Sequence, residues 1–449
     1  MNKGKLFQST VVAALAGFIF GFDMVVISGA DKAIQFEWHT TPLFHGFFIM
    51  SMALWGTVIG SVFAGAPTEK YGRKKVLIWL GIMFIASAIG SALAQDPYTF
   101  SFFRLIGGIA IGVSSVAAPT YISEISNKNN RGKLVGMYQF NIVFGILIAY
   151  LSNYLLKGVG GANDWRLMLA VLLIPALIYT IMTAGIPESP RWLLVTKNDE
   201  GEAKKTLATI GVENIEETMQ EIKVAAAEEK KNGMAKLFSI KHNKIIYLAF
   251  FIAFFNQASG INFILYYAPR ILEKAHFASK DSLQSSISIG LINLIFTFVG
   301  LWLIDRIGRK TLLIIGSFGY IFSLSMVAFS FYTGASQLFL LTFLLLFIAS
   351  HAIGQGAVIW VFISEVFPNN IRSKGQALGS ATHWVFAALI TLVAPLFIND
   401  KNDGIFNENP WPIFAFFAVM MVLQLVWVLA KVPETKGVSL EDLQKKLVQ

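Results

Sequence analysis

Two ionisable side chains lie inside stretches of the chain that are otherwise apolar. Asp23 falls within the apolar segment 9–30, and Arg104 falls within the apolar segment 98–121. A charge inside a membrane costs several kcal/mol, so it persists where it is paired or where it serves a function. A pair of Asp23 with Arg104 could act as a proton switch, because protonation of Asp23 would release Arg104. The alternative interpretation is a static ion pair that holds two helices together.

Uncharged amides form a second set of candidate residues. Gln139, Gln257, Asn262 and Asn293 all lie in apolar segments. An amide donates and accepts hydrogen bonds at once, which suits a neutral ligand that carries several hydroxyl groups. Gln257, Asn262 and Tyr266 are five and four residues apart, a spacing that places them close to one face of a helix. The alternative role for each amide is hydrogen bonding between helices.

The composition indicates that these residues lie in a membrane protein. The chain of 449 residues has a mean hydropathy of +0.61, and 14% of its residues are charged, against about 25% in soluble domains. It has no cysteine and therefore no disulfide or thiolate site, and its six His lack metal-ligand spacing. We expect no cofactor. The net charge of +9 would suggest nucleic acid in a soluble chain, but here the positions of the charges matter more, and no nucleic-acid partner is expected.

Twelve apolar segments follow one another along the chain, and each approaches the length of about 20 residues that crosses a bilayer as a helix. The polar stretch 197–243 separates six segments from six and reads as short amphipathic helices. The first segment contains Asp23 and lacks an obvious cleavage site, so we interpret it as a retained helix rather than a signal peptide. The segments are 9–30, 43–66, 74–94, 98–121, 132–156, 165–186, 244–267, 283–304, 311–332, 337–361, 374–398 and 410–431.

This pattern predicts an all-α membrane protein with twelve transmembrane helices in two six-helix bundles and a short intracellular helical segment between them. The predicted units are an N-terminal bundle at 1–190, a cytoplasmic linker at 191–243, and a C-terminal bundle with a short cytoplasmic tail at 244–449. Most of the 36 Lys and Arg residues would be cytoplasmic if both termini were cytoplasmic, which favours that orientation. Compact loops and short tails favour a bacterial inner membrane, and we expect a monomer in the bilayer.

The two halves carry matching motifs in the same order. A parallel repeat of six helices implies two bundles related by an axis along the membrane normal, with the substrate site between them near the midplane. The pairs are EKYGRKK with DRIGRKT, ISEISNKNNRGK with ISEVFPNNIRSK, and PESPRW with PETKG.

These motifs resemble those of the sugar porter family of the major facilitator superfamily, and the resemblance covers nearly the whole chain. GFDMVVISG, RLIGGIAIG and QASGINFILYYAP resemble further motifs of that family, and PESPRW and PETKG in their places are specific to it. The chain is similar to bacterial xylose and glucose proton symporters and to facilitative hexose carriers. The resemblance therefore implies the major facilitator fold.

The resemblance also implies a function, namely proton-coupled import of a monosaccharide, a hexose or pentose, by alternating access. The similar symporters carry Asp at the position of Asp23, whereas facilitative carriers have Asn, which favours the proton switch. The alternatives are a proton-independent sugar uniporter, an inositol or polyol carrier, and, from another class, a transporter-like nutrient sensor. An enzyme is not expected, because the sequence offers no nucleophile beside a base, no metal cluster and no phosphate cradle.

Further substrate contacts follow from the resemblance. Aromatic side chains can stack on the apolar faces of a sugar ring. His383 stands where the family often has Gln or Asn, and it can still hydrogen-bond a hydroxyl. Asn256 replaces a common Gln and Ala357 replaces a common Pro, so the identity of the sugar and a kink at Ala357 stay open. The residues added in this way are Phe20, Gly356, Trp360, His383 and Trp384.

Acidic and basic residues recur together in the loops expected to be cytoplasmic. The resemblance implies that they latch the inner side shut in the outward-facing state. The alternative is that the basic residues simply anchor the protein, which would not account for the acids. The expected gating residues are Glu69 with Arg73, Glu124 with Arg131, Asp305 with Arg309, and Glu365 with Arg372.

Overall fold

The computed structural model describes residues 3–127, 130–232, 237–368, 371–398, 409–438 and 447, and within these ranges the chain is helical and has no strand. Eleven helices within the described ranges are long and apolar enough to cross a membrane. The pair Pro42–Met50 and Met52–Phe63, bent by 42°, makes a twelfth if it is one span. The expectation of an all-α membrane fold is confirmed.

The first half of the chain builds a bundle in which α1 packs on α7, and α6 packs on both α3 and α5. Its helices are α1 (Lys3–Glu37), α2 (Pro42–Phe44), η1 (His45–Met50), α3 (Met52–Phe63), α4 (Gly65–Tyr71), α5 (Arg73–Leu93), α6 (Pro97–Ile125), α7 (Arg131–Leu156), η2 (Gly161–Asn163), α8 (Asp164–Ala170) and α9 (Leu173–Ala184).

The second half builds a similar bundle in which α16 packs on α21 and α17, and α13 packs on α19. Its helices are η4 (Ile240–His242), α13 (Asn243–Ala258), α14 (Ile261–Lys274), α15 (Ser279–Ile307), α16 (Arg309–Thr333), α17 (Gln337–His351), η5 (Ala352–Gly356), α18 (Ala357–Val366), α19 (Arg372–Val393), α20 (Pro395–Ile398) and α21 (Trp411–Lys431).

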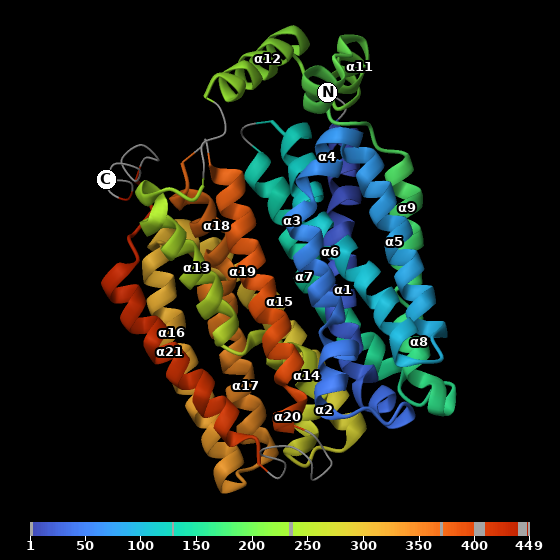
Figure 1. Ribbon diagram of the computed structural model, residues 1–449, viewed down its shortest axis with the longest axis vertical. Helices are drawn as coiled ribbons and strands as arrows, with labels where there is room; N and C mark the ends of the chain where they lie inside the picture. The colour runs from blue at the N-terminus through green and yellow to red at the C-terminus, as the bar shows by residue number, and fades with distance from the viewer. Residues whose placement is uncertain are drawn as a thin grey trace.

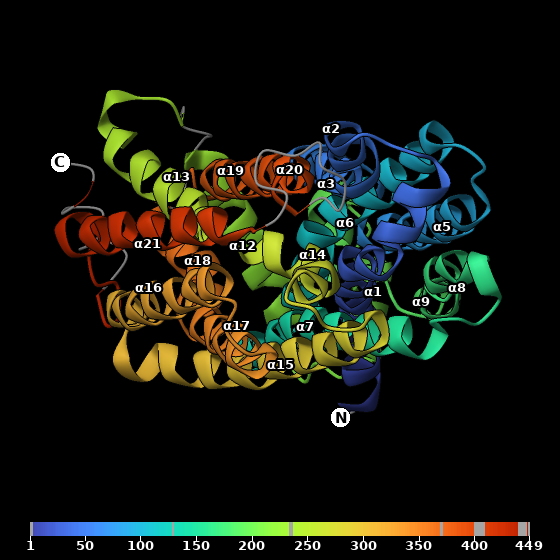
Figure 2. The ribbon, with the colours of Figure 1, turned by 90° about the horizontal axis from the view of Figure 1, so that it is seen from below.

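The two bundles stand side by side, and the segment between them lies beyond the ends of the membrane helices (Figure 1). Contacts between the bundles run along α7 with α15, α3 with α19, and α1 with α14 (Figure 2). The connecting segment contains α10 (Pro190–Trp192), η3 (Leu193–Lys197), α11 (Glu200–Thr209) and α12 (Ile215–Asn232).

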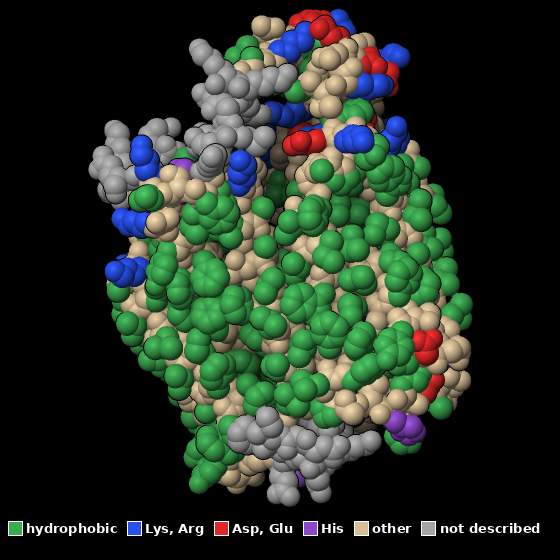
Figure 3. Space-filling view, viewed as in Figure 1, with side chains coloured by type: hydrophobic (Ala, Val, Ile, Leu, Met, Phe, Trp, Pro, Cys, Tyr) green, Lys and Arg blue, Asp and Glu red, His purple; other side chains and the backbone are tan. Residues whose placement is uncertain are grey.

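Side-chain polarity divides the surface along the long axis of the molecule. Hydrophobic side chains cover the flank, whereas Lys and Arg gather at the end where α1 begins and α21 ends (Figure 3). A lipid-facing flank must be apolar, because hydrocarbon cannot solvate charges. We call the end with α11 and α12 the basic end, and the end with α2, α14 and α20 the opposite end.

Two transmembrane spans of the second half are broken near their middle. The chain turns at Gly260, with φ +83° between α13 and α14, a conformation that favours glycine. The π-helical turn η5 interrupts the span that runs from α17 to α18. Breaks of this kind leave backbone groups without helical partners and are tolerated in a membrane where neighbouring protein covers them.

Candidate functional site

The two ionisable residues singled out in the sequence meet in the core of the first half. Nη1 of Arg104 lies 2.5 Å from Oδ1 of Asp23, and Nη2 donates to the backbone oxygen of Asp23 at 3.1 Å. Both side chains are buried, and Oδ2 of Asp23 has no hydrogen-bond partner among the residues that the structure describes. A Cβ on Gly107 would lie 3.7 Å from that oxygen. The carboxylate therefore holds the arginine with one oxygen and keeps the other uncommitted.

A cluster of amides surrounds the break between α13 and α14. Oε1 of Gln257 accepts from Nδ2 of Asn262 at 2.9 Å. Nε2 of Gln257 lies 2.9 Å from Oδ1 of Asn256 and 3.1 Å from Nε2 of His383. All four side chains are buried. Gln257 thus connects a turn of the chain with α19.

The spacing predicted that the amides would lie close to one face of a single helix, but the structure does not show this. α13 ends at Ala258 and α14 begins at Ile261, so Gln257 and Asn262 lie on opposite sides of the turn at Gly260. The turn folds the two side chains onto each other. A Cβ on Gly260 would lie 2.5 Å from the ring of Phe417, so glycine is required here for space as well as for its φ angle.

Aromatic rings continue from the amides toward the other half. The ring of His383 lies 5.0 Å from that of Trp360 and 4.7 Å from that of Trp384, between centroids. Trp384 lies 5.6 Å from Phe20 of α1, so this row of rings joins the two bundles. Trp360 is 38% exposed, which leaves a ring surface available to a ligand.

Three of the predicted contacts stand apart from these hydrogen bonds. Gln139 of α7, Asn293 of α15 and Tyr266 of α14 make no side-chain hydrogen bond with any residue that the structure describes. Tyr266 and Asn293 are buried, and Gln139 is half-buried. The polar groups of Gln139, Asn293 and Tyr266 are therefore free to hydrogen-bond a ligand. The fourth predicted contact, Gly356, ends the π-helical turn η5.

The ion pairs at the basic end form within each bundle. Nη2 of Arg73 lies 2.8 Å from Oε1 of Glu124, and Nη2 of Arg309 lies 2.8 Å from Oε1 of Glu365. Asp305 adds a 3.1 Å contact to Arg309.

The other predicted pairings at the basic end are not formed. Among the described residues, Glu69 does not pair with Arg73 through its carboxylate, Arg131 is exposed, and Nε of Arg372 donates to the backbone oxygen of Phe367 at 3.3 Å. In this conformation Arg73, Arg309 and Arg372 each contact an acceptor of their own bundle. A latch between the halves therefore stays a prediction for the outward-facing state.

The sequence motifs PESPRW and PETKG supply two acids that are not among the predicted gating residues. Oε1 of Glu188 accepts from the backbone N–H groups of Arg73 and Lys74 at 2.9 and 3.0 Å. Glu434 accepts in the same way from Arg309 and Lys310, at 2.9 and 3.0 Å. These N–H groups begin α5 and α16 and have no helical partner. Each acid therefore caps a membrane helix.

The caps connect to the ion pairs through hydroxyl groups. Ser189 donates to Glu124 at 2.6 Å, and Thr435 donates to Glu365 at 2.6 Å. Partial burial acts to raise the pKa of Glu434, but four backbone N–H groups that donate to it outweigh this effect and lower the pKa below the usual value. Both networks could have been found from the order of the motifs, because each acid follows its GRK loop by the same number of helices.

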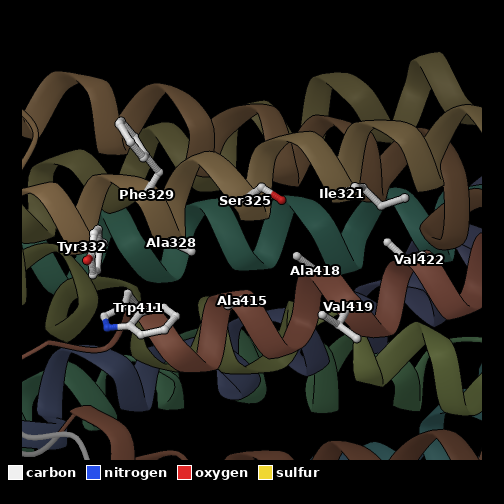
Figure 4. A pocket seen from close by; sticks show the side chains of 10 residues that line it. All are labelled: Ile321, Ser325, Ala328, Phe329, Tyr332, Trp411, Ala415, Ala418, Val419 and Val422. Carbon is white, nitrogen blue, oxygen red and sulfur yellow. The ribbon is translucent and has the colours of Figure 1, made fainter.

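One cavity of about 680 Å³ lies elsewhere, between α16 and α21 (Figure 4). Its lining is almost wholly apolar and includes none of the predicted site residues. Phe329 and Val419 in its wall are more than half exposed, so it belongs to the apolar flank. A sugar needs several hydrogen-bonding partners, which this groove lacks.

Comparisons with known proteins agree with this geometry. The family model described as "Sugar (and other) transporter" matches residues 9–447. The D-xylose-proton symporter of Escherichia coli K12 is 32% identical, over 99% of this chain and 96% of the relative. The galactose-proton symporter of the same organism is 33% identical, over 100% and 96%.

Solved structures of the xylose transporter of E. coli are similar as well. The inward-open conformation superposes with a TM-score of 0.85 at 31% identity, covering 98% of this chain and all of that one. The proton:xylose symporter bound to 6-bromo-6-deoxy-D-glucose gives a TM-score of 0.81 at 31% identity, covering 100% of both chains. The fold and the motifs therefore agree along the whole length of the chain.

Proposed function

The chain belongs to the sugar transporter family, and from this membership we infer that it imports a monosaccharide together with protons by alternating access. It is a membrane transporter and not an enzyme. The observation that carries the proposal is the joint presence of a buried acid–base pair and an amide cluster beside aromatic rings. The first can couple to protons, and the second can bind a polyhydroxylated ring.

The proposed sugar site lies between the bundles and is built mostly from the second half. Gln257 and Asn262 provide neutral donors and acceptors, and His383 adds a ring nitrogen. Trp360 provides an exposed ring face. The side chains of Gln139, Asn293 and Tyr266 make no hydrogen bond within the described chain. They complete the set of groups that can contact hydroxyls. We propose a hexose or a pentose as the substrate.

The proposed proton site is Asp23. Its Oδ2 has no partner, so a proton can add to that atom while Oδ1 still contacts Arg104. Protonation removes the negative charge, and the attraction that holds Arg104 weakens. Arg104 lies on α6 and Asp23 on α1, so the change alters how two helices of the first bundle pack. In this way a proton can bias the rocking of one bundle against the other.

The similarity to the inward-open conformation supports a structure that is closed at its opposite end. The hydroxyl of Tyr150 donates to the backbone oxygen of Leu265 at 2.7 Å, which joins α7 to α14. A Cβ on Gly46 would lie 1.9 Å from the backbone oxygen of Leu392, so η1 and α19 touch backbone to backbone. We propose that the basic end faces the cytoplasm of a bacterium, with both termini there, and that the protein acts as a monomer in the inner membrane.

Counterflow in proteoliposomes tests the proposal directly. Purified protein is reconstituted, and entry of labelled hexoses, pentoses and polyols is measured with and without a pH gradient. We expect exchange of at least one monosaccharide and its accumulation when the outside is acidic. Accumulation that ignores the pH gradient would identify a uniporter instead, and exchange restricted to inositol would identify a polyol carrier. Absence of exchange with every compound would contradict the proposal.

A further inference from the structure

A cluster of charged side chains is buried between the bundles at the opposite end. Asp31 comes from α1 and His45 from η1, both in the first half, and Arg270 comes from α14 in the second half. Their exposed fractions are 1%, 0% and 2%. α14 lies beside α1 in both views of the ribbon (Figures 1 and 2). The cluster therefore spans the line along which the halves would separate.

The carboxylate of Asp31 serves two partners from different bundles. Oδ1 lies 2.7 Å from Nε2 of His45, in the same half. Oδ2 lies 3.3 Å from Nε of Arg270, in the other half. Arg270 also contacts Gln35 of α1 through Nη2. The Asp31 carboxylate thus contacts a histidine of its own half and an arginine of the other half.

The imidazole of His45 is held at both nitrogens. Nδ1 lies 2.9 Å from the hydroxyl of Thr40. A hydroxyl donates or accepts as needed, so the same two partners satisfy neutral and protonated imidazole. A proton on His45 can therefore be accommodated without rearranging the first half, and only the charge of the cluster changes.

Other charged and titratable groups frame the cluster. Lys32 of α1 lies 2.5 Å from Glu273 of α14 at its rim, which adds a second ion pair across the interface. Tyr267 of α14 donates to the backbone oxygen of Thr391 at 2.9 Å and so is held within its own half. His39 is exposed and packs against Phe36.

The charge count gives the direction of a proton effect. With His45 neutral, Asp31 and Arg270 balance each other and the buried cluster carries no net charge. With His45 protonated, two cations share one carboxylate, and an excess positive charge is buried. Buried excess charge is unfavourable and is relieved by water, which enters when the halves separate at this end.

We propose that Asp31, His45 and Arg270 form a gate at this end, in which the Asp31–Arg270 pair holds the bundles together and a proton on His45 loosens it. The proposal rests on the proposed function only in taking this end to be the outer one. It adds to Asp23 a second protonatable position, which responds to acid on the side from which sugar and protons enter. Acid outside would then favour the conformation that accepts substrate.

A distance measurement tests the gate without sugar or transport. The chain has no cysteine, so Leu43→Cys and Leu338→Cys introduce two unique label sites. These residues are 52% and 73% exposed and lie in α2 and at the start of α17, one in each half. Spin labels at the two positions report the separation of the halves at the opposite end by pulsed electron resonance.

For the otherwise unchanged protein we expect a short distance near pH 7.5. On acidification to about pH 5.5, we expect a roughly tenfold rise in the ratio of long to short distances, the scale of a single coupling interaction. Arg270→Gln should shift the ratio toward long distances at both pH values. His45→Gln should keep the short distance and remove the response to acid.

Two matched variants control for general effects. Glu37→Gln breaks the 2.8 Å pair with Arg166 at the same end but within the first half, and His39→Gln removes an exposed histidine of the same segment. Both should keep the distances and the acid response of the parent. An acid response that survives His45→Gln, or an Arg270→Gln variant that stays closed, would overturn the gate.

Removing one buried charge can impair folding, since its partner is left unpaired. The double change Asp31→Asn with Arg270→Gln removes both charges and avoids that problem. We expect it to show long distances at both pH values, and a closed double variant would also overturn the gate. Because the distances need no substrate, a failure of the gate leaves the counterflow result intact, and a failure of counterflow leaves the distances interpretable.

Discussion

At the scale of single residues, the proposed function depends on polar atoms that form no hydrogen bond within the described part of the chain. Oδ2 of Asp23 is buried without a partner, although such an atom costs about 1–3 kcal/mol of desolvation. Gln139 and Asn293 make no side-chain hydrogen bond in the described chain. A membrane protein retains costly groups of this kind where a proton or a ligand meets them.

Replacing Asp23 with Asn should uncouple sugar movement from protons. A pH gradient of one unit stores about 1.4 kcal/mol, enough for roughly tenfold accumulation. We expect the parent to accumulate sugar up to that limit and Asp23→Asn to reach only equal concentrations, with counterflow retained. Uptake into proteoliposomes under an imposed gradient measures this.

The control for that prediction is Asp96→Asn, an acid-to-amide change at the exposed N-terminus of α6. Asp96 accepts from the N–H groups of Tyr98 and Thr99, and Asn can keep these bonds. It should accumulate sugar like the parent. Uphill accumulation by Asp23→Asn would refute the role of this carboxylate in coupling.

Replacing Gln257 with Ala should weaken sugar binding strongly. The change removes the partner of Asn256, Asn262 and His383 at once and leaves polar groups of the site unpaired. A loss of about 1–3 kcal/mol raises the dissociation constant by roughly 5- to 150-fold. Calorimetric titration with a transported sugar measures the change.

A second buried amide provides the comparison. Nε2 of Gln424 donates to the hydroxyl of Ser317 at 3.0 Å, which joins α21 to α16. Gln424→Ala should lower thermal stability and leave the dissociation constant unchanged. If both variants weakened binding equally, the effect of Gln257 would be one of stability and not of contact with the sugar.

At the scale of the elements, helix breaks and helix caps decide where side chains point. The turn at Gly260 brings Gln257 and Asn262 together, and η5 leads into the helix that carries Trp360. At the basic end, Gly72 and Gly308 precede α5 and α16 with φ of +91° and +95°. These turns aim the free N–H groups of the helices at Glu188 and Glu434.

Acid should weaken the cap formed by Glu434. Its folded-state pKa lies below the ordinary value of 4.5, so its stabilisation is complete above that value and is lost as pH falls through the lower, folded-state pKa. We expect the thermal midpoint to fall in this acidic range and to fall less in Glu434→Gln, which has no carboxylate to protonate. Thermal unfolding in detergent across the range measures both.

Glu69→Gln is the matched change in the other half, because the carboxylate of Glu69 makes no hydrogen bond or ion pair with a described residue. It should keep the pH dependence of the parent. An unchanged acid dependence in Glu434→Gln would show that the cap contributes nothing to stability.

At the scale of the whole molecule, the two halves repeat the same device at the basic end. Each half places an arginine between a glutamate of its own bundle and a backbone oxygen near the end of the preceding helix. The polar contacts named between the halves lie nearer the opposite end, with Arg270, Lys32 and Tyr150. This distribution supports a carrier closed on one side and able to rock about its centre.

Labelling from the two sides of the membrane should establish the orientation. Val224→Cys places a thiol on the linker helix α12, and Leu43→Cys places one at the opposite end. Both side chains are about half exposed, and no native cysteine competes. In intact cells we expect an impermeant maleimide to label Leu43→Cys and not Val224→Cys, because basic loops stay cytoplasmic.

Inside-out vesicles provide the matching control. There the same reagent should label Val224→Cys and spare Leu43→Cys. The opposite pattern in both preparations would place the termini outside and would reverse the sense of the proposed import.

The sequence by itself determined that the protein is an all-α membrane protein with an internal repeat and a buried acid and base. Apolar runs and repeated motifs are local in the chain, and their consequences follow from the bilayer. The sequence also identified the amides of the proposed site. Their spacing, however, predicted one continuous helix, whereas the structure has a turn at Gly260.

Only the tertiary structure decided which distant residues meet. In the sequence, Asp31, His45 and Arg270 belong to no predicted site, and Glu188 and Glu434 appear only as members of the PESPRW and PETKG motifs. Their roles depend on how α1, η1 and α14 pack, and on where α5 and α16 begin. Periodicity fixes which side chains share a face of one helix, whereas contacts between helices depend on packing across the bundle, which a single sequence does not encode in any local pattern.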